Sequence, residues 1–271
     1  MEKAVVDKPR LRVALLVTED DQVYGVHIVD MFREWLEDAM DGSTILCMDA
    51  FDAKKMEWPA QHTWQQYDGF IIPGSLNSAY DKEPWIEELA RVIQKLHADR
   101  TPFLGVCFGH QLAAQALGGR VKKNPMGTQF SRITTPLINT APAALPLPLV
   151  KDNASGGEIS LLYSHDDVVV EAPSVGVSLG GTEACPVIGV AYGSPPFAIT
   201  VQGHPEFNTK TGKGCLDVIF EYYVKVGKAT PEQVEEGRRR AAEPTDAHHV
   251  AKAVIGLFSR REGRSDSLSR G

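Results

Sequence analysis

The stretch that decides the fold is residues 102–119, PFLGVCFGHQLAAQALGG. It begins with a short apolar run, turns at the sequence GVCFG, and continues as a helix-like segment that the pair Gly118-Gly119 ends. A buried strand that runs directly into a helix is typical of α/β proteins. The turn between the two carries Cys107, flanked by Gly105 and Gly109.

Cys107 has the surroundings that a nucleophile on such a turn requires. The turn strains the backbone, and glycines on either side keep neighbouring atoms from colliding. The following helix offers free N–H groups and a positive dipole end, both of which favour a thiolate, and the N–H of Phe108 is placed to stabilise an oxyanion. On these residues alone, the alternative interpretation is a buried core cysteine between packing glycines.

Strand-like and helical segments alternate around this stretch. Compact apolar runs typical of strands cover residues 12–18, 44–48 and 69–72, while residues 24–39 and 84–97 have helical spacing. This alternation predicts a mostly parallel sheet with helices on both faces. From residue 120 to residue 201, strand-like runs are separated by Gly, Pro, Asn and Asp, which predicts an antiparallel extension. The Pro/Ala-rich and then Gly/Asn-rich residues 139–158 are expected to form a surface connection.

Composition excludes several classes of function. The 271 residues carry a formal charge of −7, which disfavours a nucleic-acid partner. No run approaches the ~20 apolar residues of a membrane span, and no signal peptide is evident, so we expect a cytoplasmic protein without a membrane partner. The four cysteines are widely and irregularly spaced, which fits neither a disulfide framework nor a zinc site. The sequence contains no glycine-rich phosphate loop and no metal-ligand spacing, and we therefore expect no cofactor and no metal.

A second group of functional residues lies in residues 199–207, ITVQGHPEF. An apolar strand ends at a glycine and is followed by His204 and Glu206. Catalysis by a cysteine requires an imidazole that takes the thiol proton and a carboxylate that orients the imidazole. The joint occurrence of Cys107 with His204 and Glu206 therefore favours a nucleophilic site over a structural histidine.

Together, GVCFGHQLAAQALGG and QGHPEF resemble the class I glutamine amidotransferases. The resemblance runs from about residue 12 to residue 223. It implies that Cys107 attacks a γ-glutamyl amide, that His204 acts as base and then acid, and that Glu206 orients His204. A γ-glutamyl thioester on Cys107 would be the intermediate, hydrolysed by water or captured by another amine.

Residues 72–80, IPGSLNSAY, and 83–86, EPWI, look like the oxyanion loop of the stand-alone GMP-synthase-like proteins and the plant γ-glutamyl peptidases. By this resemblance Ser75 and Phe108 form the oxyanion hole, with Ser75 where the GMP synthetases have a second glycine. The predicted substrate-binding residues are Gly74, Gln111, Ser164 and Asp166. Residues 164–167, SHDD, match the segment that reads the head group of the substrate in this family, and for the side chains of His165, Asp166 and Asp167 a simple polar turn is the alternative.

The sequence therefore predicts a flavodoxin-like α/β fold, a mostly parallel sheet with helices on both faces and an antiparallel extension. We expect an N-terminal tail over residues 1–11, the amidotransferase-like domain over 12–227, its helical extension over 228–258, and a disordered tail over 259–271. The predicted function is thiol-dependent hydrolysis or transfer of γ-glutamyl amides, either glutamine or γ-glutamyl peptides. The alternatives are a glutaminase that delivers ammonia to a separate synthetase subunit, and a catalytically silent scaffold.

Overall fold

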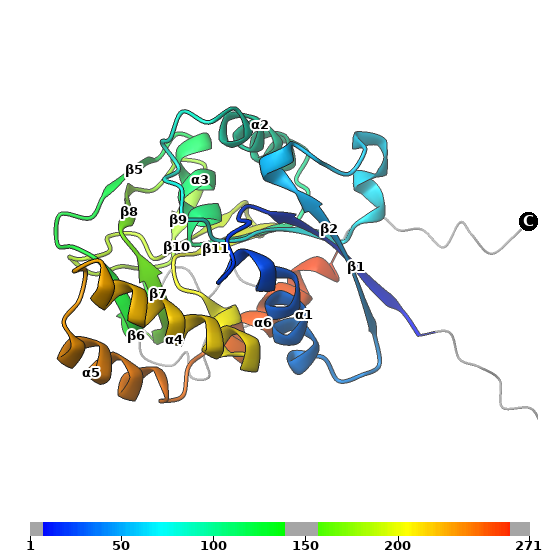
Figure 1. Cartoon of the computed structure of the whole chain (residues 1–271). Coiled ribbons are helices and arrows are strands. Elements are labelled where there is room, and N and C mark those ends of the chain that lie inside the picture. Colours follow the sequence, from blue (N-terminus) through cyan, green and yellow to red (C-terminus); the bar gives the residue numbers. More distant parts are fainter. Residues whose placement is uncertain (1–7, 139–156, 261–271) are drawn as a thin grey trace, which may run out of the picture.

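The computed structural model describes residues 8–138 and 157–260, which fold around one seven-stranded sheet of order β2-β1-β3-β4-β11-β10-β9 (Figure 1). Five neighbouring strands pair in parallel, and β10 and β9 complete one edge through antiparallel pairing of β10 with β11 and of β9 with β10. The bounds are β1 Arg10–Val17, β2 Ile45–Asp52, β3 Gly69–Ile72, β4 Phe103–Val106, β9 Gly176–Ser178, β10 Gly189–Tyr192 and β11 Ala198–Val201. The predicted fold class is confirmed.

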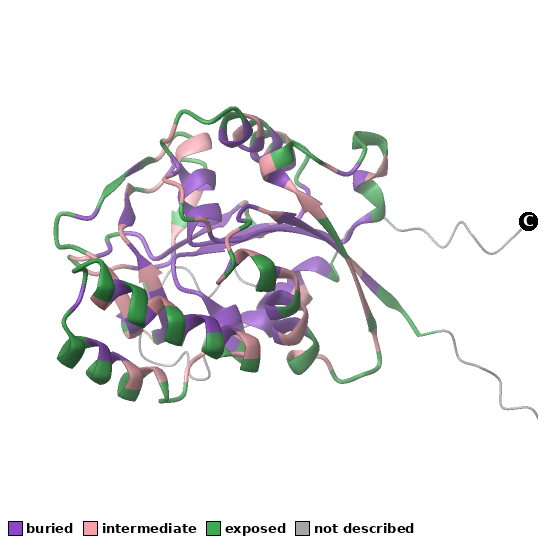
Figure 2. Ribbon diagram, viewed as in Figure 1, coloured by how far each residue is buried: buried purple, intermediate pink, exposed green. Residues whose placement is uncertain are grey.

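Helices cover both faces of the sheet. On one side lie α1 (Ile28–Ala39) and α6 (Ala247–Phe258), with α4 (Lys210–Lys225) beside them, and on the other lie α2 (Pro84–Ala98) and α3 (Phe108–Ala116) (Figure 1). Because successive strand residues point to opposite faces, Leu15 belongs to the core beneath α1, while Ala14 and Leu16 belong to the core beneath α2. Figure 2 shows the buried sheet between these two layers.

The predicted antiparallel extension is confirmed in β9 and β10 and in two further strand pairs, but β11, which the prediction placed in it, pairs in parallel with β4. One pair is β5 (Arg120–Lys123) with β8 (Asp167–Glu171), and the other is β6 (Gln129–Pro136) with β7 (Glu158–His165). Helix α5 (Pro231–Ala241) packs against β6 and α4. Four short 3-10 helices complete the described residues: Gly25–His27, Ala53–Lys55, Gln61–Gln66 and Pro205–Asn208.

The predicted element bounds differ from the structure at a few ends. Strand β1 begins at Arg10, and the segment expected to be helical from residue 24 begins with a 3-10 turn. The helix expected from residue 215 begins at Lys210, because the Thr209 side chain caps it by accepting from the N–H of Gly212. At the start of α5, the capping box of Thr230 and Gln233 is confirmed. Most of the predicted connection 139–158 and parts of both predicted tails, 1–11 and 259–271, lie outside the described residues.

The register of the parallel strands determines where functional residues meet. Val106, the last residue of β4, pairs with Val201, the last residue of β11, and Ile72 at the end of β3 pairs with Gly105. The three segments that follow these strands therefore leave the sheet side by side, at the edge where open α/β sheets usually bind ligands. Within the described chain, no helix has the length and apolar character needed to cross a membrane.

Candidate active site

Cys107 occupies a strained turn between β4 and α3. Its backbone angles are φ 50° and ψ −104°, in a region that residues with a side chain rarely adopt. The turn is held from both sides, because the Cys107 N–H donates to the Val201 carbonyl at 2.9 Å and the Cys107 carbonyl accepts from the N–H of Gln111 at 2.9 Å. Strain of this kind persists only where the surrounding structure fixes it, and it is typical of functional sites.

The two flanking glycines allow close approach of the backbone. A Cβ at Gly105 would lie 2.7 Å from the Gly109 carbonyl oxygen, and a Cβ at Gly109 would overlap the Ile72 carbonyl. Neither glycine has a positive φ, so space rather than backbone conformation requires them. The predicted reason for both glycines is confirmed.

His204 follows β11 and faces the same pocket as Cys107. The backbone N–H of His204 donates to the Leu162 carbonyl at 2.7 Å. The ring nitrogen Nδ1 lies 2.7 Å from Glu206 Oε1, and the ring stacks on Phe207 with centroids 4.3 Å apart. Burial lowers the pKa of His204, but the negative charges of Glu206 and Cys107 outweigh burial and raise this pKa to about 10. With Nδ1 directed to Glu206, Nε2 is the ring nitrogen left for proton transfer.

Tyr24, which the sequence analysis did not select, lies next to this histidine. Its phenol donates to Glu206 Oε1 at 3.1 Å and accepts from the Gly74 N–H at 3.2 Å. Burial and the nearby charge of Glu206 raise the pKa of Tyr24 well above its usual value, so it remains a neutral donor. The ring is also edge-on to both His204 and Phe207.

The predicted oxyanion loop follows β3 and is anchored by Thr18 and Glu19, the two residues that follow β1. The Thr18 hydroxyl donates to the Gly74 carbonyl at 2.6 Å, and the buried Glu19 carboxylate accepts from the Ser75 hydroxyl at 3.0 Å and from the Leu76 N–H at 2.8 Å. Glu19 is in turn paired with Lys54.

Ser75 does not occupy a glycine-type conformation, since its φ is not positive. The side chain at this position therefore causes no strain of the left-handed kind in the backbone. Within residues 8–138 and 157–260, neither the Ser75 N–H nor the Phe108 N–H donates a hydrogen bond to another residue. Ser75 lines the pocket that contains Cys107, whereas Phe108 is buried and lies outside the pocket lining.

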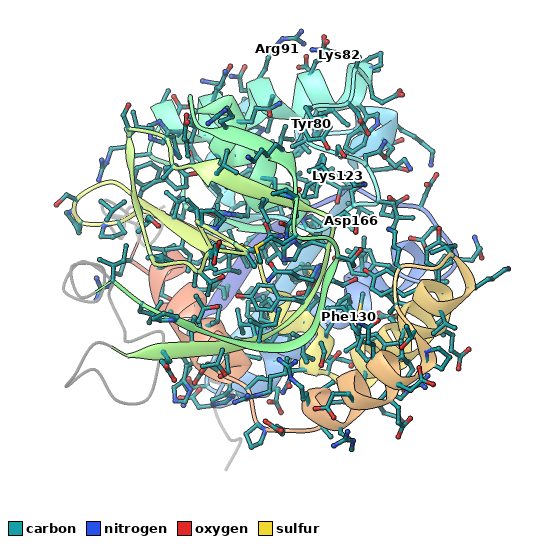
Figure 3. All side chains as sticks on the ribbon, turned by 90° about the vertical axis from the view of Figure 1, so that its left-hand side faces the viewer. Tyr80, Lys82, Arg91, Lys123, Phe130 and Asp166 are labelled. Atoms are coloured by element: carbon teal, nitrogen blue, oxygen red, sulfur yellow. The ribbon has the colours of Figure 1, made fainter. Side chains whose placement is uncertain are left out.

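The other predicted substrate-binding residues lie in different surroundings. Ser164 lines the pocket with Cys107, and its hydroxyl is 2.6 Å from that of Tyr223. Gln111 is buried and donates to the Asp167 carbonyl at 2.9 Å, outside the pocket lining. The Asp166 carboxylate also lies outside it, beside Lys123 (Figure 3) and paired with Lys228. Burial lowers the pKa of His165, the residue before Asp166, to about 3, so the His165 side chain is neutral.

The pocket has a volume of about 480 Å³. It brings together Gly74 and Ser75 from the loop after β3, Cys107, Ser164 and His204, with Glu206 buried behind the histidine. Elsewhere, burial raises the pKa of Cys185 to about 12 and that of Cys215 to about 11, so these thiols are held protonated. Among the described residues, no group of three or more His, Cys, Asp or Glu side chains gathers in a way that could hold a metal ion.

Comparison with known proteins shows the family to which the chain belongs. The family model of the class I glutamine amidotransferases matches residues 48–221, more than half of the chain. γ-Glutamyl peptidase 5 of Arabidopsis thaliana is 28% identical over 203 residues, which cover 71% of this chain and 77% of the plant protein. The glutamine-hydrolysing GMP synthase of Methylobacillus flagellatus is 31% identical over 209 residues, covering 72% of this chain and 38% of the synthase.

Among solved structures, the glutamine amidotransferase of Methylobacillus flagellatus superposes with a TM-score of 0.65 at 16% identity, covering 98% of this chain and 100% of that protein. The likeness in structure extends over the fold as a whole. The chain belongs to the class I glutamine amidotransferase family, as the motifs around Cys107 and His204 indicated.

Proposed function

We propose that the protein hydrolyses γ-glutamyl amides with Cys107 as the nucleophile, His204 as acid and base, and Glu206 as the residue that orients His204. The observation that carries this proposal is the shared pocket of Cys107 and His204 at the ends of two paired strands, with His204 Nδ1 2.7 Å from Glu206. The raised pKa of His204 supports an imidazolium that can give its proton to the leaving nitrogen.

In the first half of the reaction, the Cys107 sulfur attacks the γ-carbonyl carbon, and the N–H groups of Ser75 and Phe108 stabilise the oxyanion. The carbon–nitrogen bond then breaks while the His204 imidazolium gives its proton to the leaving nitrogen. The amine departs, and a γ-glutamyl thioester remains on Cys107.

In the second half, neutral His204 takes a proton from water, and the resulting hydroxide adds to the thioester carbonyl. The carbon–sulfur bond breaks, which releases glutamate and restores the thiolate beside the imidazolium. An amine in place of water would give transfer instead of hydrolysis.

Autonomous action on γ-glutamyl peptides is supported by the relatives that are γ-glutamyl peptidases and by the oxyanion-loop sequence around Gly74 and Ser75. The second candidate is a glutaminase that delivers ammonia to a separate synthetase. It is favoured by the relatives that are glutamine-hydrolysing GMP synthases, of which this chain matches only a part.

The deciding experiment compares hydrolysis of glutamine with that of glutathione by the wild-type protein and by Cys107→Ala. Cleavage of glutathione with slow turnover of glutamine, lost in Cys107→Ala, is the expected result. Ammonia release from glutamine alone would favour the glutaminase. If neither substrate reacts, labelling of Cys107 by a glutamine-like chloroketone would indicate a glutaminase inactive without its partner, and absence of labelling a silent scaffold.

A further inference from the structure

One wall of the pocket is apolar and is built largely by α4. Val218, Ile219 and Tyr222 line it from the helix, and Leu76 lines it from the oxyanion loop. Three of these side chains are strongly exposed, at 46% for Val218, 51% for Tyr222 and 79% for Leu76. Apolar side chains grouped in this way around a pocket mark a binding surface more often than scattered ones do.

Glutamine does not account for this wall. A γ-glutamyl group offers an amino group and a carboxylate joined by a short methylene chain, and the ammonia that leaves glutamine has no apolar surface. A pocket of about 480 Å³ is also in the range of about 300–1,000 Å³ that holds ligands larger than a single amino acid. The part of the substrate that matches the wall is therefore the amine on the far side of the scissile amide.

The charged residues around the wall point to the same end of the substrate. The Asp21 carboxylate accepts hydrogen bonds from the backbone N–H groups of the turn that follows it. The Glu221 carboxylate forms an ion pair with the Arg238 guanidinium at 3.4 Å. Lys225 lines the pocket but forms no ion pair with any residue of the described chain. On α4, positions 218, 222 and 225 share one face, which places this free cation at the end of the apolar wall.

We propose that the α4 wall is the binding site for the leaving group, and that this group is a large apolar amino acid whose free carboxylate pairs with Lys225. This inference rests on the proposed function and narrows its substrates to γ-glutamyl dipeptides with an apolar second residue. Val218, Ile219, Tyr222 and Leu76 contact the apolar side chain, and Lys225 reads the terminal carboxylate.

The test measures kcat/KM for γ-glutamyl-phenylalanine, its C-terminal amide, γ-glutamyl-glycine and glutamine. Burial of a phenylalanine side chain on the wall should favour γ-glutamyl-phenylalanine over γ-glutamyl-glycine about tenfold or more. Loss of the carboxylate in the amide should lower kcat/KM about tenfold, because a charge-assisted contact is removed.

Two variants assign these preferences to the wall. Tyr222→Ser should reduce the preference for phenylalanine over glycine, and Lys225→Gln should abolish the preference for the carboxylate over the amide. The matched control is Lys213→Gln, an exposed lysine on the same helix that lies outside the pocket lining, and it should change neither ratio.

Equal kcat/KM values for the phenylalanine and glycine dipeptides, with turnover that still requires Cys107, would overturn the leaving-group site while the proposed function stands. An unchanged preference for phenylalanine over glycine in Tyr222→Ser would also overturn the leaving-group site. That result is expected if the wall binds a protein partner instead of the substrate. If Lys225→Gln slows glutamine and the dipeptides equally, Lys225 binds the γ-glutamyl carboxylate and the assignment is wrong. Absence of turnover on every substrate together with absence of Cys107 labelling would overturn both proposals.

Discussion

The Tyr24 phenol donates a hydrogen bond of 3.1 Å to Glu206 Oε1, across 182 positions of the sequence. The Tyr24 phenol oxygen in turn accepts from the Gly74 N–H at 3.2 Å. The Tyr24 side chain therefore joins the Glu206 carboxylate to the backbone of Gly74, the residue before Ser75. Tyr24 is a positioning residue in this arrangement, since it acts on the reaction only through the groups it holds.

Replacing Tyr24 with Phe keeps the ring and removes both hydrogen bonds. We expect kcat to fall about tenfold with little change in KM, and the free energy of unfolding to fall by about 1 kcal/mol. The measurements are steady-state kinetics on a γ-glutamyl peptide and urea denaturation. Tyr67→Phe is the control, because it removes a phenolic hydrogen bond of 2.9 Å to Asp49 far from the pocket. A kcat unchanged by Tyr24→Phe would contradict the positioning role.

The Glu206→Gln variant tests how His204 is kept protonated. Burial lowers the pKa of His204, but Glu206 and Cys107 raise it to about 10, so activity that needs the imidazolium should be lost only as the pH rises through about 10. Removing the carboxylate charge lowers this pKa, and the alkaline limb of the kcat/KM profile should move to lower pH. A limb at the same pH in the variant would show that His204 is not the titrating acid.

The close approach of backbone at Gly109 predicts a large effect on stability. A Cβ in Gly109→Ala would overlap the Ile72 carbonyl, and we expect the free energy of unfolding to fall by about 2–4 kcal/mol. Gly214→Ala on α4 is the matched control, because nothing lies within 4 Å of the added Cβ and alanine favours a helix by about 0.5–1 kcal/mol. Urea unfolding of both variants checks this pair. Equal stabilities would mean that α3 shifts freely away from β3.

Local sequence was sufficient to predict the elbow at Cys107 and the pairing of His204 with Glu206. An apolar strand followed by a turn is visible in sequence, and His204 and Glu206 are two residues apart. That Cys107 and His204 share a pocket depends on β4 and β11 being neighbours. The resemblance implied that the two side chains lie close together, but the sequence analysis placed residues 199–201 in the antiparallel extension and did not predict their parallel pairing with β4.

Tyr24 and Glu19 could not be found in the same way. Their contacts join residues that follow the first strand to segments far along the chain, and a local pattern does not predict such contacts. For Glu19 one signal was available, an acidic residue directly after a strand-like run, and for Tyr24 there was none. The apolar wall on α4 could not be predicted for another reason. Apolar residues at helical spacing have the same sequence pattern whether they face the core or a pocket.

Trapping the thioester tests the central claim most directly. The protein is mixed with a γ-glutamyl peptide, quenched in acid within the first turnovers, and digested for mass spectrometry of the peptide that contains Cys107. We predict a mass increase of one γ-glutamyl group on Cys107, removed by hydroxylamine and absent from Cys107→Ala, which should also lose turnover. Undiminished turnover by Cys107→Ala, or an acyl group on another residue, would contradict the account.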